Sequence, residues 1–146
     1  DSYQRICKER NITLTATIQP DLSMVGNLPF LKRAVGNLID NAIKFTKDAI
    51  SIQVVKLNNT IRITIKDNGE GINQDDLDKI WNRMYQVDQA RTKKANQGLG
   101  LGLYFVKNVI NLHQAKAYAI SEPHVSTSFI LEFPIMTDEA FREDTP

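Results

Sequence analysis

The most constraining feature of this sequence is a change of apolar period between residues 30 and 67. Over residues 30–45 apolar side chains recur three or four positions apart and form one broad stripe, which predicts an amphipathic helix. Residues 49–57 and 60–67 follow. The second of these segments alternates isoleucine with polar side chains, as half-buried strands do, and the Asn-Asn pair between the two segments predicts a hairpin turn. A one-sided helix and a one-sided sheet are expected to bury their apolar faces together.

The remaining segments predict more elements of the same two kinds. Residues 12–18 alternate as a strand does, and Pro20 then interrupts the pattern. Asn73 is a candidate N-cap for a short helix that ends near Ile80. Further predicted elements are a helix at 101–112 and strands at 115–121 and 127–133. The sum is an α+β fold in which about five strands are covered on one face by about three helices.

Length, charge and cysteine content exclude several classes of protein. A chain of 146 residues fits one domain, and a formal net charge of +1 argues against a broad nucleic-acid surface. No apolar run approaches the length of a membrane span. The single cysteine, Cys7, excludes an internal disulfide and fits a reducing compartment. Because the sequence starts at Asp1 without a signal peptide, we expect a piece of a longer protein.

Two polar segments interrupt or follow the periodic ones. Residues 82–100 are polar and basic and have no sustained period, which inside a domain is typical of a functional or mobile segment. Residues 136–146 form a polar tail or linker.

The predicted helix at 30–45 carries a line of polar side chains opposite its apolar stripe. Asn37, Asn41 and Lys44 stack along one line, with Asp40 beside them. One interpretation is a solvated face. The other is a binding site, since amide and carboxylate oxygens suit Mg²⁺ and a lysine one turn away suits a phosphate. The helix alone does not decide between them.

Two glycine-rich segments could approach a ligand closely. In "DNGEGI", residues 67–72, Asp67 ends a strand and could accept a hydrogen bond from an adenine amino group, although the same letters also form ordinary turns. In "GLGLGL", residues 98–103, free backbone N–H groups at a helix start could meet phosphate oxygens, or the glycines could serve as a hinge. The spacing fits neither a Walker loop nor a dinucleotide-binding fingerprint.

Taken in order, these segments resemble the catalytic ATP-binding domain of sensor histidine kinases, within the superfamily that includes gyrase, Hsp90 and MutL. "NLIDNAIKFT" resembles its N box, "DNGEGI" its first glycine box, "IWNRMYQVD" its F box and "GLGLGLYFVKNVI" its second glycine box. The resemblance spans about residues 9–135. It implies the Bergerat fold, a two-layer α/β sandwich with a mixed, mostly antiparallel sheet and a mobile ATP lid, and it implies ATP and Mg²⁺ as ligands.

The resemblance also implies a role for individual residues. Asn41 would be the main Mg²⁺ ligand with Asn37 assisting, Lys44 would meet the phosphates, and Asp67 would read the adenine amino group. Arg83 would reach the γ-phosphate and count with Asn37, Asn41 and Lys44 among the catalytic residues. The remaining predicted nucleotide contacts are Phe45, Gly69, Gly71, Ile72, Tyr85, Gly98, Leu99, Gly100, Leu101, Gly102 and Ser128.

The sequence departs from the family at two turns, and one further position separates the branches of the superfamily. "HQA" at residues 113–115 and "HVSTS" at 124–128 replace glycine-containing motifs. In the gyrase and Hsp90 branch a glutamate that activates water stands one turn before the Mg²⁺-binding asparagine. Here that position is Asn37, and an amide is no base at neutral pH. Asn37 therefore favours phosphoryl transfer over hydrolysis.

The resemblance further implies partners and a location. The acceptor would be a histidine on a separate helical dimerisation domain, with residues 1–10 as the end of the connection to it, and a response regulator would follow downstream. The parent would be a homodimer, anchored in a membrane with this domain in the cytoplasm, without direct contacts to membrane or nucleic acid. His113 and His124 are interpreted as structural or surface residues. Alternatives are a serine kinase of the anti-sigma type and a nucleotide-sensing module without transfer activity.

Overall fold

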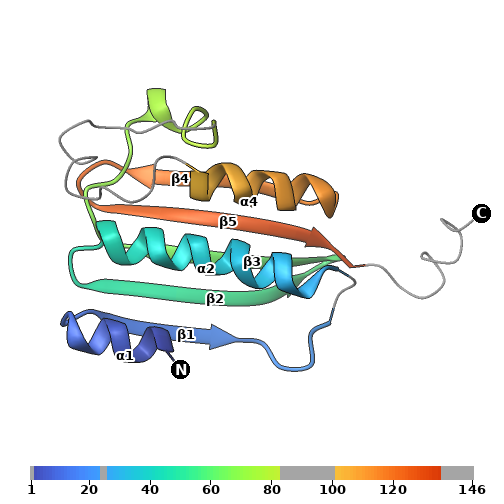
Figure 1. Ribbon diagram of the computed structural model, residues 1–146, viewed down its shortest axis with the longest axis horizontal. Helices are drawn as coiled ribbons and strands as arrows, with labels where there is room; N and C mark the ends of the chain where they lie inside the picture. The colour runs from blue at the N-terminus through green and yellow to red at the C-terminus, as the bar shows by residue number, and fades with distance from the viewer. Residues whose placement is uncertain (1, 24–25, 83–100, 136–146) are drawn as a thin grey trace, which may run out of the picture.

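A computed structural model describes residues 2–23, 26–82 and 101–135 of the chain (Figure 1). Its elements, in chain order, are α1 (Ser2–Glu9), β1 (Thr13–Ile18), α2 (Leu28–Phe45), β2 (Ala49–Leu57), β3 (Thr60–Asp67), the 3₁₀ turn η1 (Gln74–Asp76), α4 (Leu101–Leu112), β4 (Lys116–Glu122) and β5 (Ser126–Pro134). The five strands form one sheet in the order β1-β2-β3-β5-β4. Strand β1 runs parallel to β2, and the other three pairs are antiparallel.

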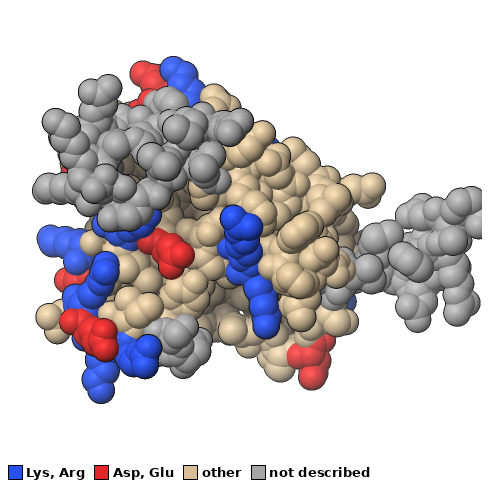
Figure 2. All heavy atoms as spheres, viewed as in Figure 1, with Lys and Arg blue, Asp and Glu red and all other residues tan. Residues whose placement is uncertain are grey.

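The helices lie on one face of this sheet, so the molecule has two layers (Figure 1). Helix α2 is the crossover between the parallel strands β1 and β2, and α4 lies beside it and packs against it. This arrangement is the mixed, mostly antiparallel sheet with helices on one side that was predicted. On the helix side of the molecule, basic side chains are scattered among acidic ones rather than gathered in one patch (Figure 2).

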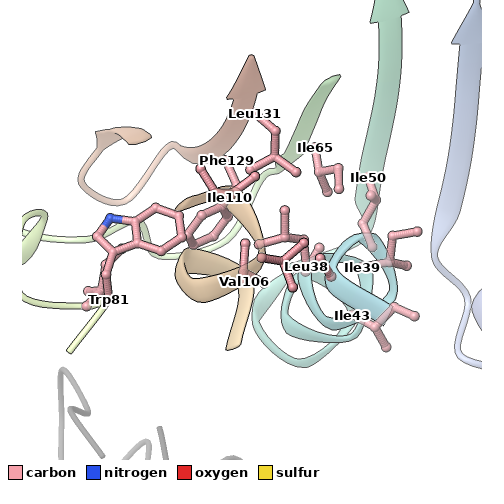
Figure 3. Close-up of a cluster of buried hydrophobic side chains, with 14 of the residues drawn as sticks. Leu38, Ile39, Ile43, Ile50, Ile65, Trp81, Val106, Ile110, Phe129 and Leu131 are labelled. Carbon is pink, nitrogen blue, oxygen red and sulfur yellow. The ribbon is translucent and has the colours of Figure 1, made fainter. Parts of the chain in front are cut away.

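The core lies between the two helices and the sheet. Leu38 of α2 and Val106 of α4 are fully buried and point toward Leu131 and other side chains of the sheet (Figure 3). Trp81 closes one end of the core, where its ring meets that of Phe129 edge-on with 5.8 Å between the ring centroids. Edge-to-face aromatic pairs of this kind add to the free energy gained by burying the two rings.

Helix α1 was not predicted from the sequence, which assigned residues 1–10 to a connection. Its Cys7 is only 1% exposed and belongs to the same hydrophobic cluster as α2. The Cys7 carbonyl accepts a hydrogen bond of 2.8 Å from the Ile12 N–H, which fixes the entry into β1. Burial raises the pKa of the Cys7 thiol above its ordinary value, so this cysteine behaves as a small apolar side chain rather than a reactive thiolate.

The bounds of the predicted elements agree with the structure to within one residue except at two places. Helix α2 begins at Leu28, two residues before the predicted start, because the Asn27 side chain caps it by accepting the Phe30 N–H at 3.1 Å. The predicted helix from Asn73 to Ile80 is wrong as an α-helix. It is a single 3₁₀ turn followed by further turns, since so short a segment gains too few helical hydrogen bonds.

His113 ties the end of α4 to the beginning of α2. Its Nδ1–H donates to the Val109 carbonyl at 2.8 Å, and its Nε2 accepts the Asn27 N–H at 2.9 Å. The ring also meets that of Phe133 edge-on, with 6.2 Å between centroids. The interpretation of His113 as a structural residue agrees with these contacts.

Gln114 offers a test of the turn that follows α4. Its φ is +55°, a left-handed conformation that costs a non-glycine residue about 1–2 kcal/mol. We expect Gln114→Gly to raise the free energy of unfolding by about 1 kcal/mol and the melting temperature by roughly 3 °C. The matched control is Gln53→Gly in β2, which should lower the melting temperature. A less stable Gln114→Gly variant in thermal melts would contradict this account of the turn.

None of the helices in the described ranges has both the length and the hydropathy that a membrane span requires.

Candidate functional site

Three buried polar side chains lie in one row across the end of the sheet. Asp67 of β3 pairs in register with Thr127 of β5, which pairs with Ser121 of β4. They are 4%, 4% and 7% exposed, and they are the polar side chains that lie buried among the described residues. The Ser121 and Thr127 hydroxyl oxygens are 3.4 Å apart. Because an apolar core does not favour a carboxylate, this row marks a polar end of the core with a specific use.

The loop after β3 is bound to this row at both ends. The Asp67 Oδ1 accepts the Gly69 N–H at 2.8 Å. Further along, the Ser121 hydroxyl accepts the Ile72 N–H at 2.6 Å and donates to the Ser126 carbonyl at 3.0 Å. The first glycine segment, residues 67–72, is therefore a fixed rim of the polar row.

Both glycines of this rim are required by close packing. A Cβ at position 69 would lie 2.0 Å from the Phe45 carbonyl oxygen at the end of α2. Gly71 has a φ of +78°, and a Cβ there would lie 2.8 Å from the Glu122 carbonyl oxygen. The loop thus joins the end of α2 to the β4–β5 hairpin, and no other residue type fits at either position without a shift.

The same hairpin contacts the loop at the surface. The His124 N–H donates to the Glu70 carbonyl, and the His124 Nδ1 lies 2.8 Å from the Glu70 carboxylate. Since these side chains are 83% and 69% exposed, the pair contributes little to stability. His124 is a surface histidine, as interpreted from the sequence.

The polar line on α2 faces the start of α4. Asn37 and Asn41 are half-buried, whereas Asp40 and Lys44 are exposed. The Asn37 side-chain amide donates to the Gly102 carbonyl at 3.3 Å, and a Cβ at Gly102 would lie 3.9 Å from the Asn37 Cβ. The structure therefore brings Asn37 against Gly102, the last glycine of the second glycine segment, and the half-buried Asn37 and Asn41 do not lie on a fully solvated face.

Five predicted site residues, Arg83, Tyr85, Gly98, Leu99 and Gly100, lie outside the described residues. So does nearly all of the segment 82–100 that the sequence predicted to be functional or mobile. Leu101 and Gly102 begin α4.

Ser128 lies outside the polar row, and the β5 residue within the row is Thr127. Ser128 pairs with the exposed Lys66, while Thr127 pairs with the buried Asp67. Since neighbouring residues of a strand point to opposite faces, only Thr127 shares the helix-covered face with Asp67. The sequence held a signal for this, because Thr127 is in phase with the apolar Phe129 and opposite in phase to Ser128. Ser121 was also missed.

A cluster of three or more histidine, cysteine, aspartate or glutamate side chains able to hold a metal is absent from the described ranges. A site built from the Asn37 and Asn41 amide oxygens is of another kind, suited to a hard cation that keeps several of its waters.

The family model of the histidine kinase-, DNA gyrase B- and HSP90-like ATPases matches residues 26–137. The match includes the α2 line, the loop after β3 and the hairpin that carries Ser121 and Thr127. The chain belongs to this family, and the resemblance seen in its motifs is confirmed.

Relatives and solved structures agree with that assignment. Drug sensory protein A of Synechocystis sp. is 33% identical over 147 residues, and sensor-like histidine kinase SenX3 of Mycolicibacterium smegmatis is 32% identical over 135 residues. These matches cover 92% and 91% of this chain but only 22% and 35% of the two relatives. The chain thus spans about a fifth to a third of their length.

Among solved structures, the mycobacterial sensor histidine kinase MprB aligns with a TM-score of 0.77 at 24% identity, covering 91% of this chain and 89% of MprB. The catalytic domain of histidine kinase ThkA aligns with a TM-score of 0.78 at 22% identity, covering 91% and 85%. These similarities confirm the predicted fold class.

Proposed function

We propose that this chain is the Mg-ATP-binding catalytic domain of a sensor histidine kinase and supplies the γ-phosphate for phosphorylation of a histidine on a separate helical domain. The observation that carries the proposal is the buried Asp67, held by a glycine rim at the end of the sheet in a chain of this family. A buried carboxylate that contacts a bound ligand would select for a hydrogen-bond donor such as the adenine amino group.

The residues around Asp67 would contact different parts of the nucleotide base. Thr127 and Ser121 would complete the polar wall for the base, with Phe45, Gly69, Gly71 and Ile72 as its rim. Thr127 replaces Ser128 in this proposal because it shares the face of Asp67.

The α2 line would hold the phosphate end of the nucleotide. Asn41 and Asn37 offer amide oxygens to Mg²⁺, and the exposed Lys44 offers a positive charge to the phosphates. Bound Mg²⁺ would neutralise phosphate charge during transfer. Arg83, Tyr85 and the glycines at 98–102 stay predicted contacts.

Transfer is favoured over hydrolysis by the chemistry of position 37. Asn37 cannot accept a proton from water at neutral pH, and its amide already donates to Gly102. The contribution of the chain to transfer would then be positioning and charge neutralisation.

The proposed setting follows the relatives named above as sensor kinases. Residues 1–135 would form the catalytic unit and 136–146 a tail or linker. The partners would be a helical dimerisation and phosphoacceptor domain of a homodimeric parent, and a response regulator that receives the phosphate. We place this unit in the cytoplasm of a membrane-anchored parent.

The test uses ATP labelled at the γ-phosphate, with Mg²⁺ and this domain, in the presence and absence of the helical segment of the parent chain. We expect label on a histidine of that segment only when both parts are present. Steady release of free phosphate by the domain alone would contradict the argument from Asn37. Tight nucleotide binding with neither reaction would instead favour the nucleotide-sensing module.

A further inference from the structure

Asn68 makes a network of hydrogen bonds that none of the roles above uses. Its side-chain Oδ1 accepts the Thr46 hydroxyl at 2.9 Å and the backbone N–H groups of Lys47, Asp48 and Ala49 at 3.1 Å each. Its Nδ2 donates to the Asp48 carboxylate at 2.7 Å. One carboxamide thus closes the whole turn between α2 and β2.

That turn connects the end of α2, which carries Lys44 and Phe45, directly to strand β2. Thr46 is the C-cap of α2, so the segment bound by Asn68 begins directly after Lys44 and Phe45. The Asn68 N–H also donates to the Ala49 carbonyl at 3.3 Å, and the Thr46 hydroxyl, which has one proton to share between this carbonyl and Asn68 Oδ1, lies 2.8 Å from the same carbonyl oxygen. The end of α2 is therefore fixed to the position that follows Asp67.

We infer that Asn68 is a positioning residue of the nucleotide site, whose carboxamide sets the end of α2 that carries Lys44 and Phe45 against the base-reading Asp67. The inference rests on the proposed function. Gly69 supports it, because its close approach to the Phe45 carbonyl leaves the two segments in direct contact. A ligand that spans from Asp67 to Lys44 requires both ends of the site at a fixed spacing.

The pattern of donors and acceptors explains why this position carries asparagine. An apolar side chain would leave the backbone N–H groups of Lys47, Asp48 and Ala49 without this acceptor, whereas the Thr46 hydroxyl would keep the Ala49 carbonyl. Aspartate would accept the same four donors but would lose the donor to Asp48 and place two carboxylates together. We therefore expect that exchanging the two side chains, so that aspartate stands at position 68 and asparagine at position 48, preserves the network.

The experiment measures the Kd of Mg-ATP and the melting temperature for the wild type, Asn68→Ala, and the exchanged pair Asn68→Asp with Asp48→Asn. We expect Asn68→Ala to bind about tenfold more weakly at a temperature where it is fully folded. The exchanged pair should bind within about threefold of the wild type, because an amide at position 48 can donate to a carboxylate at position 68. Asn68→Ala combined with Asp48→Asn should remain weak.

The matched control is His113→Ala, which removes one hydrogen bond to Asn27 at the opposite end of α2 and one to Val109 of α4. It should lower the melting temperature and leave the Kd unchanged, which separates positioning from general loss of stability. An Asn68→Ala variant with wild-type affinity, or an exchanged pair that binds as weakly as Asn68→Ala, would overturn the inference. A wild-type domain that does not bind Mg-ATP would overturn the proposed function itself and this inference with it.

Discussion

Asp67→Asn is expected to weaken ATP binding by about 10- to 100-fold, because the adenine amino group loses a charged acceptor in a buried site. The substitution keeps the size of the side chain, and the amide oxygen can still accept the Gly69 N–H that Asp67 accepts at 2.8 Å. The fold should therefore persist, with a melting temperature equal to or above that of the wild type, since a buried neutral amide costs less desolvation than a carboxylate.

The ratio of GTP affinity to ATP affinity tests the role of Asp67 more specifically than ATP affinity alone. An amide at position 67 can donate as well as accept, so the ratio of GTP to ATP affinity should rise. Titration calorimetry with both nucleotides measures that ratio. The matched control, Asp75→Asn, changes an exposed carboxylate of η1 and should alter neither affinity. An unchanged ATP affinity and an unchanged ratio in Asp67→Asn would contradict the assignment of the base site.

The elements that the sequence predicted well are those whose side chains have one clear period. Helix α4 and strand β3 show one apolar face each, and their bounds agree with the structure. Helix α1 was missed because Cys7 alone is fully buried among the α1 side chains that the structure describes, and its short polar sequence resembles a linker. The parallel pairing of β1 with β2 depends on contacts far apart in the sequence, and the family resemblance, not the local pattern, implied a mixed sheet.

The candidate site divides in the same way. Asp67 and the asparagine line were predicted because each lies in a motif that is continuous in sequence. Thr127 and Ser121 lie beside Asp67 only because of the register of β3, β5 and β4. That register cannot be predicted from the local pattern of a single sequence. The role of Asn68 was not predicted, because the sequence "DNG" is typical of ordinary turns. The hydrogen-bond partners of Asn68 lie about 20 residues earlier in the chain, and the sequence pattern does not indicate them.

Asn41→Ala is expected to remove the Mg²⁺-dependent part of nucleotide binding and to abolish phosphoryl transfer. Asn41 lies on the α2 line between Asn37 and Lys44 and is half-buried, and in the proposed function its amide oxygen would be the main protein ligand of Mg²⁺. Loss of roughly 3 kcal/mol of metal-assisted contact corresponds to an affinity about 100-fold weaker. Alanine is the better helix former, so α2 should remain intact.

The measurement compares ATP affinity with Mg²⁺ and with a chelator in place of the metal. The wild type should bind much more tightly with Mg²⁺, whereas Asn41→Ala should bind equally and weakly in both conditions. Asp40→Ala, one position away on the exposed side of α2, is the matched control and should keep the full Mg²⁺ dependence. If Asn41→Ala kept that dependence as well, the metal would be held by other residues, and the metal role assigned to Asn41 would be wrong.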